Sequence, residues 1–273
     1  IDTDSNYIVF PHLKTAQETW DHAEYVAGEV TKLFPKPMEL EFEQEIYTFF
    51  FILTKKRYMY QKCLRDGIVN KKIGNKGVLL ARRDNSQVIR DIYEMVITKI
   101  ADNVDMDDII YYVLEKINEM CSSSRPIKDF VVTKAVGDCD GLNAEPTVNE
   151  KGEKKLKVGN YTIKPLPTSK IEREKALALK GAADEKEYYL LSLPAQVQLA
   201  ERMKRRGQPA PPGTRLEYVI TRPDIHTAKQ YEKIENIEYL ARHSDIIKVD
   251  YLYYLKALVN PLDQVMDVAF EEG

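Results

Sequence analysis

The chain has 273 residues, of which 44% are hydrophobic and 30% are charged, and its formal net charge at pH 7 is −3. This length can supply one large or two ordinary domains with real cores, and so small a net charge excludes a polyanion binder that works through overall charge alone. No apolar run approaches the length of a membrane span and no signal peptide precedes the first residue, so a soluble, intracellular protein is expected.

Cysteine and histidine residues give no sign of a disulfide framework or a zinc site. The three cysteines, Cys63, Cys121 and Cys139, lie far apart and form no C-x-x-C pair. The four histidines show no H-E-x-x-H spacing, so each is expected to be a surface or packing residue.

The first ten residues combine two aspartates with a β-forming run in IDTDSNYIVF. The run Tyr7–Phe10 predicts a strand or one arm of a hairpin. Because side chains alternate along a strand, Asp2 and Asp4 share one face there. Two such carboxylates repel each other unless they share a proton or a cation. A polar hairpin tip, in which Asp is common for turn reasons alone, is the more common explanation of an isolated D-x-D, so the pair needs support from other parts of the sequence.

A helix and then a sheet are predicted for residues 15–84. Thr15 and Glu18 have the spacing of a capping box, and the apolar residues that follow recur at helical intervals up to a stop at Pro35. Residues 38–58 begin as alternation and become a nearly continuous aromatic run, which predicts one or two buried strands. A turn-rich segment and a short strand, VLLARRD at 78–84, complete this part.

The rest of the chain is predicted to be mainly helical. Two helices follow Ser86, and 193–207 is an amphipathic helix ended by Gly207. The final segment predicts a helix, a break at Pro261 and a second helix. Strands are expected at 130–136 and 214–220, exposed loops or insertions at 137–159 and 168–192, and core positions at Tyr251, Tyr253 and Tyr254.

Basic residues are concentrated in two stretches. Residues 55–83 carry ten Lys or Arg residues against Asp66 alone, a local charge of +9. Residues 202–222 carry six against Glu217 alone. A run of charge is usually a solvated face, but two such concentrations in a nearly neutral protein favour a phosphate backbone as the partner.

Five motifs occur in one order along the chain: DTDS at 2–5, KKRY at 55–58, KGVLLARRD at 76–84, QVQLAERMKRRG with GTRLEYVI within 196–220, and VDYLYYLKALVNP at 249–261. In this order they resemble the carboxy-terminal part of a B-family DNA polymerase, of a type found in large DNA viruses. Ile1 departs from the pattern, because glycine commonly precedes D-T-D in the family.

The resemblance implies two-metal nucleotidyl transfer with two Mg²⁺ ions. Asp4 matches the second aspartate of D-T-D and would be the catalytic metal ligand, and Asp2 matches the first and would lie beside the metals. Hard cations take oxygen ligands, which carboxylates supply. The D-x-x-S-L-Y-P-S and K-x-x-x-N-S-x-Y-G segments of the family are absent from this sequence, so the chain is expected to be a fragment, to share its metals with residues outside it, and to be inactive alone.

The resemblance also implies contacts to primer–template DNA. Lys56 would donate to minor-groove acceptors near the primer end, with Lys55, Arg57 and Tyr58 near primer phosphates and neighbouring protein residues. The other candidate DNA-binding residues are Lys76, Arg82, Arg83, Arg202, Arg205, Arg206 and Arg215.

The expected fold is α+β, with an antiparallel palm sheet and packed helices in residues 1–98 and a mainly helical thumb in residues 99–273. The expected function is DNA-directed DNA polymerase, with dNTP and an unidentified processivity factor as further partners, in the nucleus or at a cytoplasmic viral replication site. One alternative is a non-catalytic duplex-binding module derived from a polymerase. A second is a metal-dependent nuclease, which leaves the thumb motifs unexplained.

Overall fold

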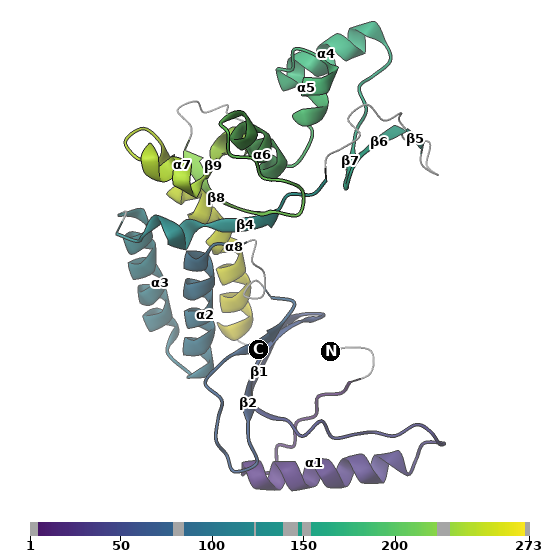
Figure 1. Cartoon of the computed structure of the whole chain (residues 1–273). Coiled ribbons are helices and arrows are strands. Elements are labelled where there is room, and N and C mark those ends of the chain that lie inside the picture. The colour runs from purple at the N-terminus through teal and green to yellow at the C-terminus, as the bar shows by residue number, and fades with distance from the viewer. Residues whose placement is uncertain are drawn as a thin grey trace. The chain divides into compact units, whose positions relative to one another are not determined.

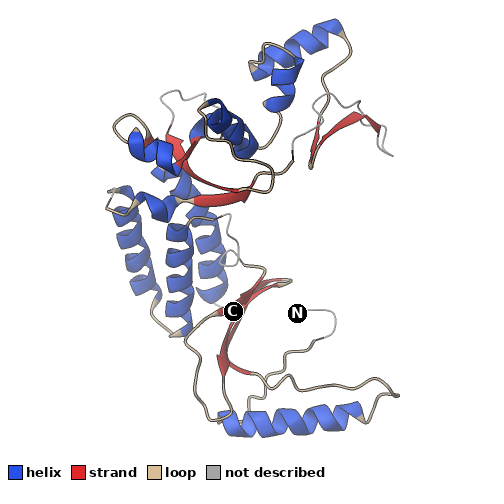
Figure 2. Cartoon of the chain, viewed as in Figure 1, coloured by secondary structure: helices blue, strands red, loops and turns tan. Residues whose placement is uncertain are grey.

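The computed structural model describes residues 5–78, 85–122, 124–138, 147–148, 154–222 and 230–270. Helices and antiparallel strands make up the described chain, which confirms the α+β class (Figures 1 and 2). The chain divides into two compact units. The first comprises 1–82, 89–119 and 255–273, and the second comprises 83–88 and 120–254. The predicted boundary between palm and thumb at residue 98 stays a prediction.

The sheet of the first unit has the strand order β1-β2-β3, with β1 at Ile46–Thr54, β2 at Arg57–Cys63 and β3 at Gly74–Lys76. Its aromatic and β-branched residues favour strands because they pack well on a pleated surface. The sheet begins later than residue 38, where alternation first appears. The predicted strand at 7–10 is wrong, because residues 5–10 join no ladder and Tyr7 packs its ring against Phe50 instead, with a centroid distance of 4.5 Å.

Helix α1 (Ala16–Thr31) confirms the predicted capping box. The Thr15 hydroxyl accepts a hydrogen bond from the Glu18 amide at 3.2 Å, and the Glu18 carboxylate accepts one from the Thr15 amide at 3.0 Å. This reciprocal pair satisfies two amide groups that have no acceptor within the helix.

The helices α2 (Gln87–Ala101), α3 (Met106–Cys121) and α8 (Tyr251–Phe270) confirm the helical periodicity of their sequences. The predicted break at Pro261 is wrong, because α8 runs through it without interruption. Leu258, Leu262 and Val265 follow one face of α8 and are all buried, so packing holds the two halves in one helix.

The second unit is built on a sheet in the order β10-β8-β4, with β9 paired to β8. The strand bounds are Val132–Ala135 for β4, Arg215–Arg222 for β8, Ile234–Asn236 for β9 and Lys248–Val249 for β10. Helices α6 (Ala195–Arg205) and α7 (Ile237–Arg242) and the short 3₁₀ helices η2 (Ile127–Phe130) and η3 (Gln230–Lys233) accompany it. Tyr254 is fully buried as predicted, whereas Tyr253 is 42% exposed, so the prediction that all three tyrosines are core is wrong for Tyr253.

The two segments expected to be loops or insertions contain regular structure. They include β5 (Thr147–Val148), β6 (Lys154–Val158), α4 (Lys170–Lys180) and α5 (Glu185–Leu190), and β7 (Tyr161–Ile163) lies between the two segments. Leu156 and Val158 are fully buried, so β6 has a packed face despite its polar neighbours in sequence. The strand predicted at 78–84 lies almost entirely outside the described residues.

Candidate nucleic-acid interface

Lys55 and Lys56 form the tip of the β1–β2 hairpin, because Thr54 pairs with Arg57 across the turn. Lys56 has φ 64°, in the left-handed region that few residues other than glycine adopt. Lys55, Lys56 and Arg57 are all exposed. The sequence therefore places three adjacent cations on a sharply turned, solvent-facing hairpin end.

A glycine brings the end of β3 against this turn. Gly77 has φ +66°, and a Cβ at this position would lie 2.2 Å from the carbonyl oxygen of Lys56. Only glycine permits so close an approach of two backbones. Lys76, one residue earlier, pairs with Tyr58 and is exposed. Lys55, Lys56, Arg57 and Lys76 are thus brought together, and we call them the hairpin cluster.

Aromatic residues of β1 and β2 pack next to the hairpin cluster. Tyr58 is 1% exposed and stacks on Phe50 at a centroid distance of 5.2 Å. The Tyr58 ring also has the Lys76 ammonium 5.9 Å from its centroid. The predicted DNA-contacting set therefore contains three exposed cations at the turn and one buried tyrosine that anchors them.

Tyr7 is a member of this arrangement that sequence reasoning missed. Its hydroxyl lies 3.1 Å from the Tyr58 hydroxyl, which links the segment after Asp4 to the hairpin. Burial and this hydrogen bond raise the pKa of Tyr7 to about 12. Tyr7 belongs to an apolar aromatic run in the sequence, but nothing in that run indicates a partner 51 residues away.

The arginines predicted for the second basic stretch have different environments. Arg205 in α6 and Arg215 in β8 are exposed. Arg206 instead donates to both carboxylate oxygens of Glu235, at 2.9 and 3.2 Å. Arg202 donates to the carbonyl oxygen of Ile234 at 2.5 Å. Glu235 was not among the predicted site residues, because no local pattern connects β9 with α6.

Four of the predicted site residues, Asp2, Asp4, Arg82 and Arg83, lie outside the described residues. Within the described part of the chain, no group of three or more His, Cys, Asp or Glu residues could hold a metal ion. The predicted magnesium ligands therefore stay a prediction from sequence.

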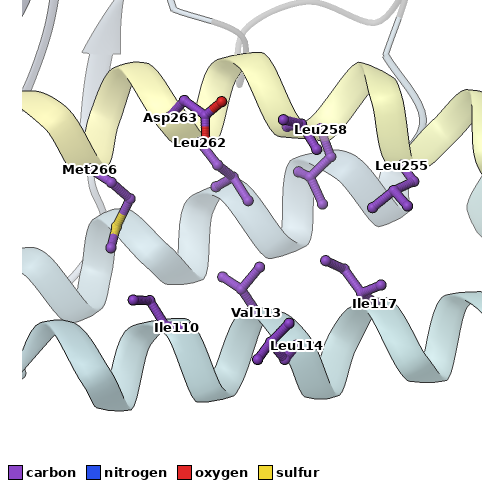
Figure 3. A pocket seen from close by; sticks show the side chains of 10 residues that line it. Ile110, Val113, Leu114, Ile117, Leu255, Leu258, Leu262, Asp263 and Met266 are labelled. Carbon is purple, nitrogen blue, oxygen red and sulfur yellow. The ribbon is translucent and has the colours of Figure 1, made fainter.

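An apolar groove of about 190 Å³ lies between α3 and α8 (Figure 3). Ile110, Val113, Ile117, Leu258 and Leu262 line it with other aliphatic side chains, and Asp263 supplies its one carboxylate. Nucleotide and phosphate ligands need donors and cations, which this lining lacks, so the groove does not fit a dNTP.

The family model described as DNA polymerase family B matches residues 2–269. The chain belongs to this family. DNA polymerase 120R of Invertebrate iridescent virus 3 is 43% identical over 99% of this chain, and putative DNA polymerase 060R of Frog virus 3 is 39% identical over 98% of it. The expected resemblance to a B-family polymerase of large DNA viruses is thereby confirmed.

The chain spans about a quarter of the length of these relatives, 24% of the first and 27% of the second. A solved family B DNA polymerase from the archaeon Pyrobaculum calidifontis aligns with 91% of this chain, and the alignment covers 24% of the polymerase chain, at 18% identity and a TM-score of 0.48.

Among the described residues of this family B chain, no helix has both the length and the apolar character that crossing a membrane requires.

Proposed function

We propose that the chain is the part of a DNA-directed DNA polymerase that holds the primer–template duplex and contributes aspartates to the catalytic magnesium site. The observation that carries the proposal is the hairpin cluster, in which Lys55, Lys56, Arg57 and Lys76 meet at one exposed hairpin end of a family B chain. The names of the polymerase relatives favour this enzyme over a non-catalytic binding module.

The hairpin cluster suits a duplex that must be held without being read. Phosphates and the minor-groove acceptors that every base pair presents are the groups a sequence-independent grip can use. Lys56, held at the turn by its unusual backbone conformation, is proposed to donate in the minor groove. Lys55, Arg57 and Lys76 are proposed to neutralise phosphates nearby, and Arg82, Arg83, Arg205 and Arg215 are proposed as further phosphate contacts.

Asp4 and Asp2 are proposed to hold two Mg²⁺ ions together with residues outside this sequence. Their carboxylate oxygens fit a hard cation by donor chemistry. The bound ions would stabilise charge on the attacking and leaving oxygens of nucleotidyl transfer. Tyr7 follows Asp4 by three residues in the sequence, and its hydroxyl lies 3.1 Å from the hydroxyl of Tyr58 in the hairpin.

Primer–template DNA and dNTP are the proposed ligands of the whole polymerase, and a processivity factor is a proposed further partner. The proposed place of action is inside the infected cell, in the nucleus or at a cytoplasmic replication site. These proposals rest on the viral polymerase relatives.

The test separates binding from chemistry in the full-length polymerase. Asp4→Ala is expected to abolish single-turnover primer extension with Mg²⁺ while leaving duplex affinity within a few-fold, because the carboxylate acts on the metals. Asp2→Ala is expected to have a milder effect on extension. Near wild-type extension by Asp4→Ala would refute the metal assignment.

Lys56→Ala is expected to weaken the affinity for unrelated duplexes to the same extent and to lower the salt dependence of binding slightly. An affinity loss that is confined to particular duplex sequences would refute the minor-groove assignment.

A further inference from the structure

We propose that the basic residues at the end of α6, including Arg206 at its C-cap, have two separate tasks. Arg202 and Arg206 latch the helix to the buried carboxylate of Glu235, and Lys204 and Arg205 bind the phosphates of duplex DNA. This inference rests on the proposed function. It keeps Arg205 as a phosphate contact, adds Lys204, and gives Arg202 and Arg206 a structural role in place of the DNA contact expected from sequence.

The latch centres on Glu235, which lies in β9 and is 6% exposed. Both of its carboxylate oxygens accept from the Arg206 guanidinium, at 2.9 and 3.2 Å, and one also accepts from the Asn236 amide at 2.9 Å. A buried carboxylate needs such paired and hydrogen-bonded surroundings. A DNA phosphate would therefore have to compete with this buried carboxylate for the Arg206 guanidinium.

Two further contacts hold the latch. The guanidinium carbon of Arg206 lies 3.7 Å from the centroid of the Tyr239 ring in α7, the geometry of a cation–π contact. Arg202 donates to the Ile234 carbonyl oxygen at 2.5 Å and comes within 4.0 Å of Glu235. These contacts join α6 to β9 and α7, which lie next to one another in the second unit (Figure 1).

Lys204 and Arg205 differ from this pair in their position around the helix. Arg202 and Arg206 are four residues apart and share a helix face, Lys204 is two residues from each and lies on the opposite side, and Arg205, three residues after Arg202, lies at the edge of the shared face. Both are exposed, and the Lys204 side chain is 68% exposed. The neighbouring Glu201 carboxylate lies 4.0 Å from the Lys204 ammonium, a distance at which an exposed ion pair holds the lysine only weakly.

The end of α6 is well defined, so these two cations are presented from a fixed position. The Gly207 amide donates to the Lys204 carbonyl at 3.0 Å and the Gln208 amide donates to the Met203 carbonyl at 2.9 Å. With φ +81° at Gly207, this is the Schellman pattern of helix termination. The alternative role for Lys204 and Arg205 is to interact favourably with the dipole of α6, because cations stabilise a helix C-terminus. In that case their removal would lower stability and leave DNA binding unchanged.

The experiment measures primer–template affinity of the full-length polymerase over a series of salt concentrations, together with the thermal unfolding midpoint. Each phosphate contact removed lowers the slope of log affinity against log salt by about 0.9 in magnitude. Lys204→Ala and Arg205→Ala are expected to lower the slope by about this amount each and to leave the midpoint unchanged. Arg206→Ala and Glu235→Gln are expected to lower the midpoint by several degrees without reducing the slope.

Charge-conserving variants are the matched controls. Arg205→Lys is expected to keep the wild-type slope, because a phosphate accepts from either cation. Arg206→Lys is expected to stay destabilised, because a lysine cannot make the two parallel hydrogen bonds to Glu235. Unchanged slopes in both Lys204→Ala and Arg205→Ala, or a reduced slope in a folded Arg206→Ala, would overturn the division of tasks. Wild-type protein that binds duplex without salt dependence would overturn the proposed function as well.

Discussion

Gly77 is the residue that brings β3 against the turn at Lys56. Its φ of +66° disfavours a larger residue, and its approach to the Lys56 carbonyl oxygen excludes one, because an added Cβ would lie 2.2 Å from that oxygen. The obstacle is a backbone atom, which cannot rotate away as a flexible side chain can. A single glycine in the sequence thus determines the position of a cationic turn 21 residues earlier.

Gly77→Ala is therefore expected to destabilise the chain and to weaken duplex binding by displacing Lys56. Gly67→Ala is the matched control in the same unit, because Gly67 has φ +85° but its added Cβ would meet nothing closer than 4.0 Å. The control should cost about 1–2 kcal/mol for the left-handed backbone alone. Gly77→Ala should cost roughly 1–3 kcal/mol more, as forced overpacking does. Equal urea midpoints for the two variants would contradict this account of Gly77.

Helix α8 is fixed at its first turn by one hydroxyl group. The Tyr254 hydroxyl donates to the Phe130 carbonyl of η2 at 2.7 Å and accepts from the Ile220 amide of β8 at 2.9 Å. Within the second unit, it joins the first turn of α8 to two segments that are far away in sequence. Burial raises the pKa of this hydroxyl, so it stays neutral and able to donate.

Tyr254→Phe should lower the free energy of unfolding by about 1–3 kcal/mol, because the buried Ile220 amide and Phe130 carbonyl lose their partner. Tyr253→Phe makes the same chemical change one residue away, at a side chain that is 42% exposed. It should alter stability by less than about 0.5 kcal/mol. Denaturant unfolding of both variants tests the pair, and equal losses would refute the role given to the Tyr254 hydroxyl.

Helix α2 contains a buried phenol that makes stability depend on pH. Tyr93 is 2% exposed, and burial raises its pKa to about 12 from 10.0, although the Arg57 charge opposes the shift. A raised pKa means that the folded state favours the protonated form. The resulting stability is complete below pH 10.0 and is lost as the pH rises to about 12.

The loss over that pH interval should be about 2–3 kcal/mol, the equivalent of a two-unit shift. Tyr93→Phe should remove this part of the pH dependence, whereas Tyr25→Phe, at a residue 62% exposed, should keep the wild-type profile. Urea unfolding at intervals between pH 8 and pH 11.5 measures both. An unchanged alkaline profile in Tyr93→Phe would show that another group titrates there.

At the scale of the whole molecule, local patterns in the sequence predicted local structure well. Apolar periodicity located α2, α3 and α6, the capping box located the start of α1, and Gly207 marked the end of α6. The family resemblance, confirmed over residues 2–269, also depends on short motifs in order. These features are determined by neighbours within a few residues.

Contacts between distant segments could not be predicted in the same way. The Tyr7–Tyr58 hydrogen bond and the Arg206–Glu235 pair join residues 51 and 29 positions apart, and no spacing rule connects them. The break expected at Pro261 failed for a related reason, because tertiary burial of Leu258 and Val265 outweighs the local preference of proline. Tertiary packing therefore determines the long-range contacts of the candidate interface and the continuity of α8 through Pro261, and neither could be predicted from local sequence.

The 273-residue chain by itself is expected to lack polymerase activity but to bind duplex DNA. It offers the D-T-D pair of the proposed metal site and no K-x-x-x-N-S-x-Y-G segment, and phosphoryl transfer depends on positioning and electrostatics that need all the parts together. The hairpin cluster and the exposed cations of α6 remain available to phosphates, so binding should be weak, should fall steeply with salt and should show no preference for a primer end.

Primer extension and duplex binding by the purified chain at low and moderate salt measure these two expectations separately. A charge-neutral competitor protein of similar size controls for non-specific retention of the DNA. Template-directed extension by the chain alone would show that its aspartates suffice for catalysis. Binding that persists unchanged at moderate salt would show that contacts other than phosphate neutralisation hold the duplex, because exposed cations lose their advantage as counterion concentration rises.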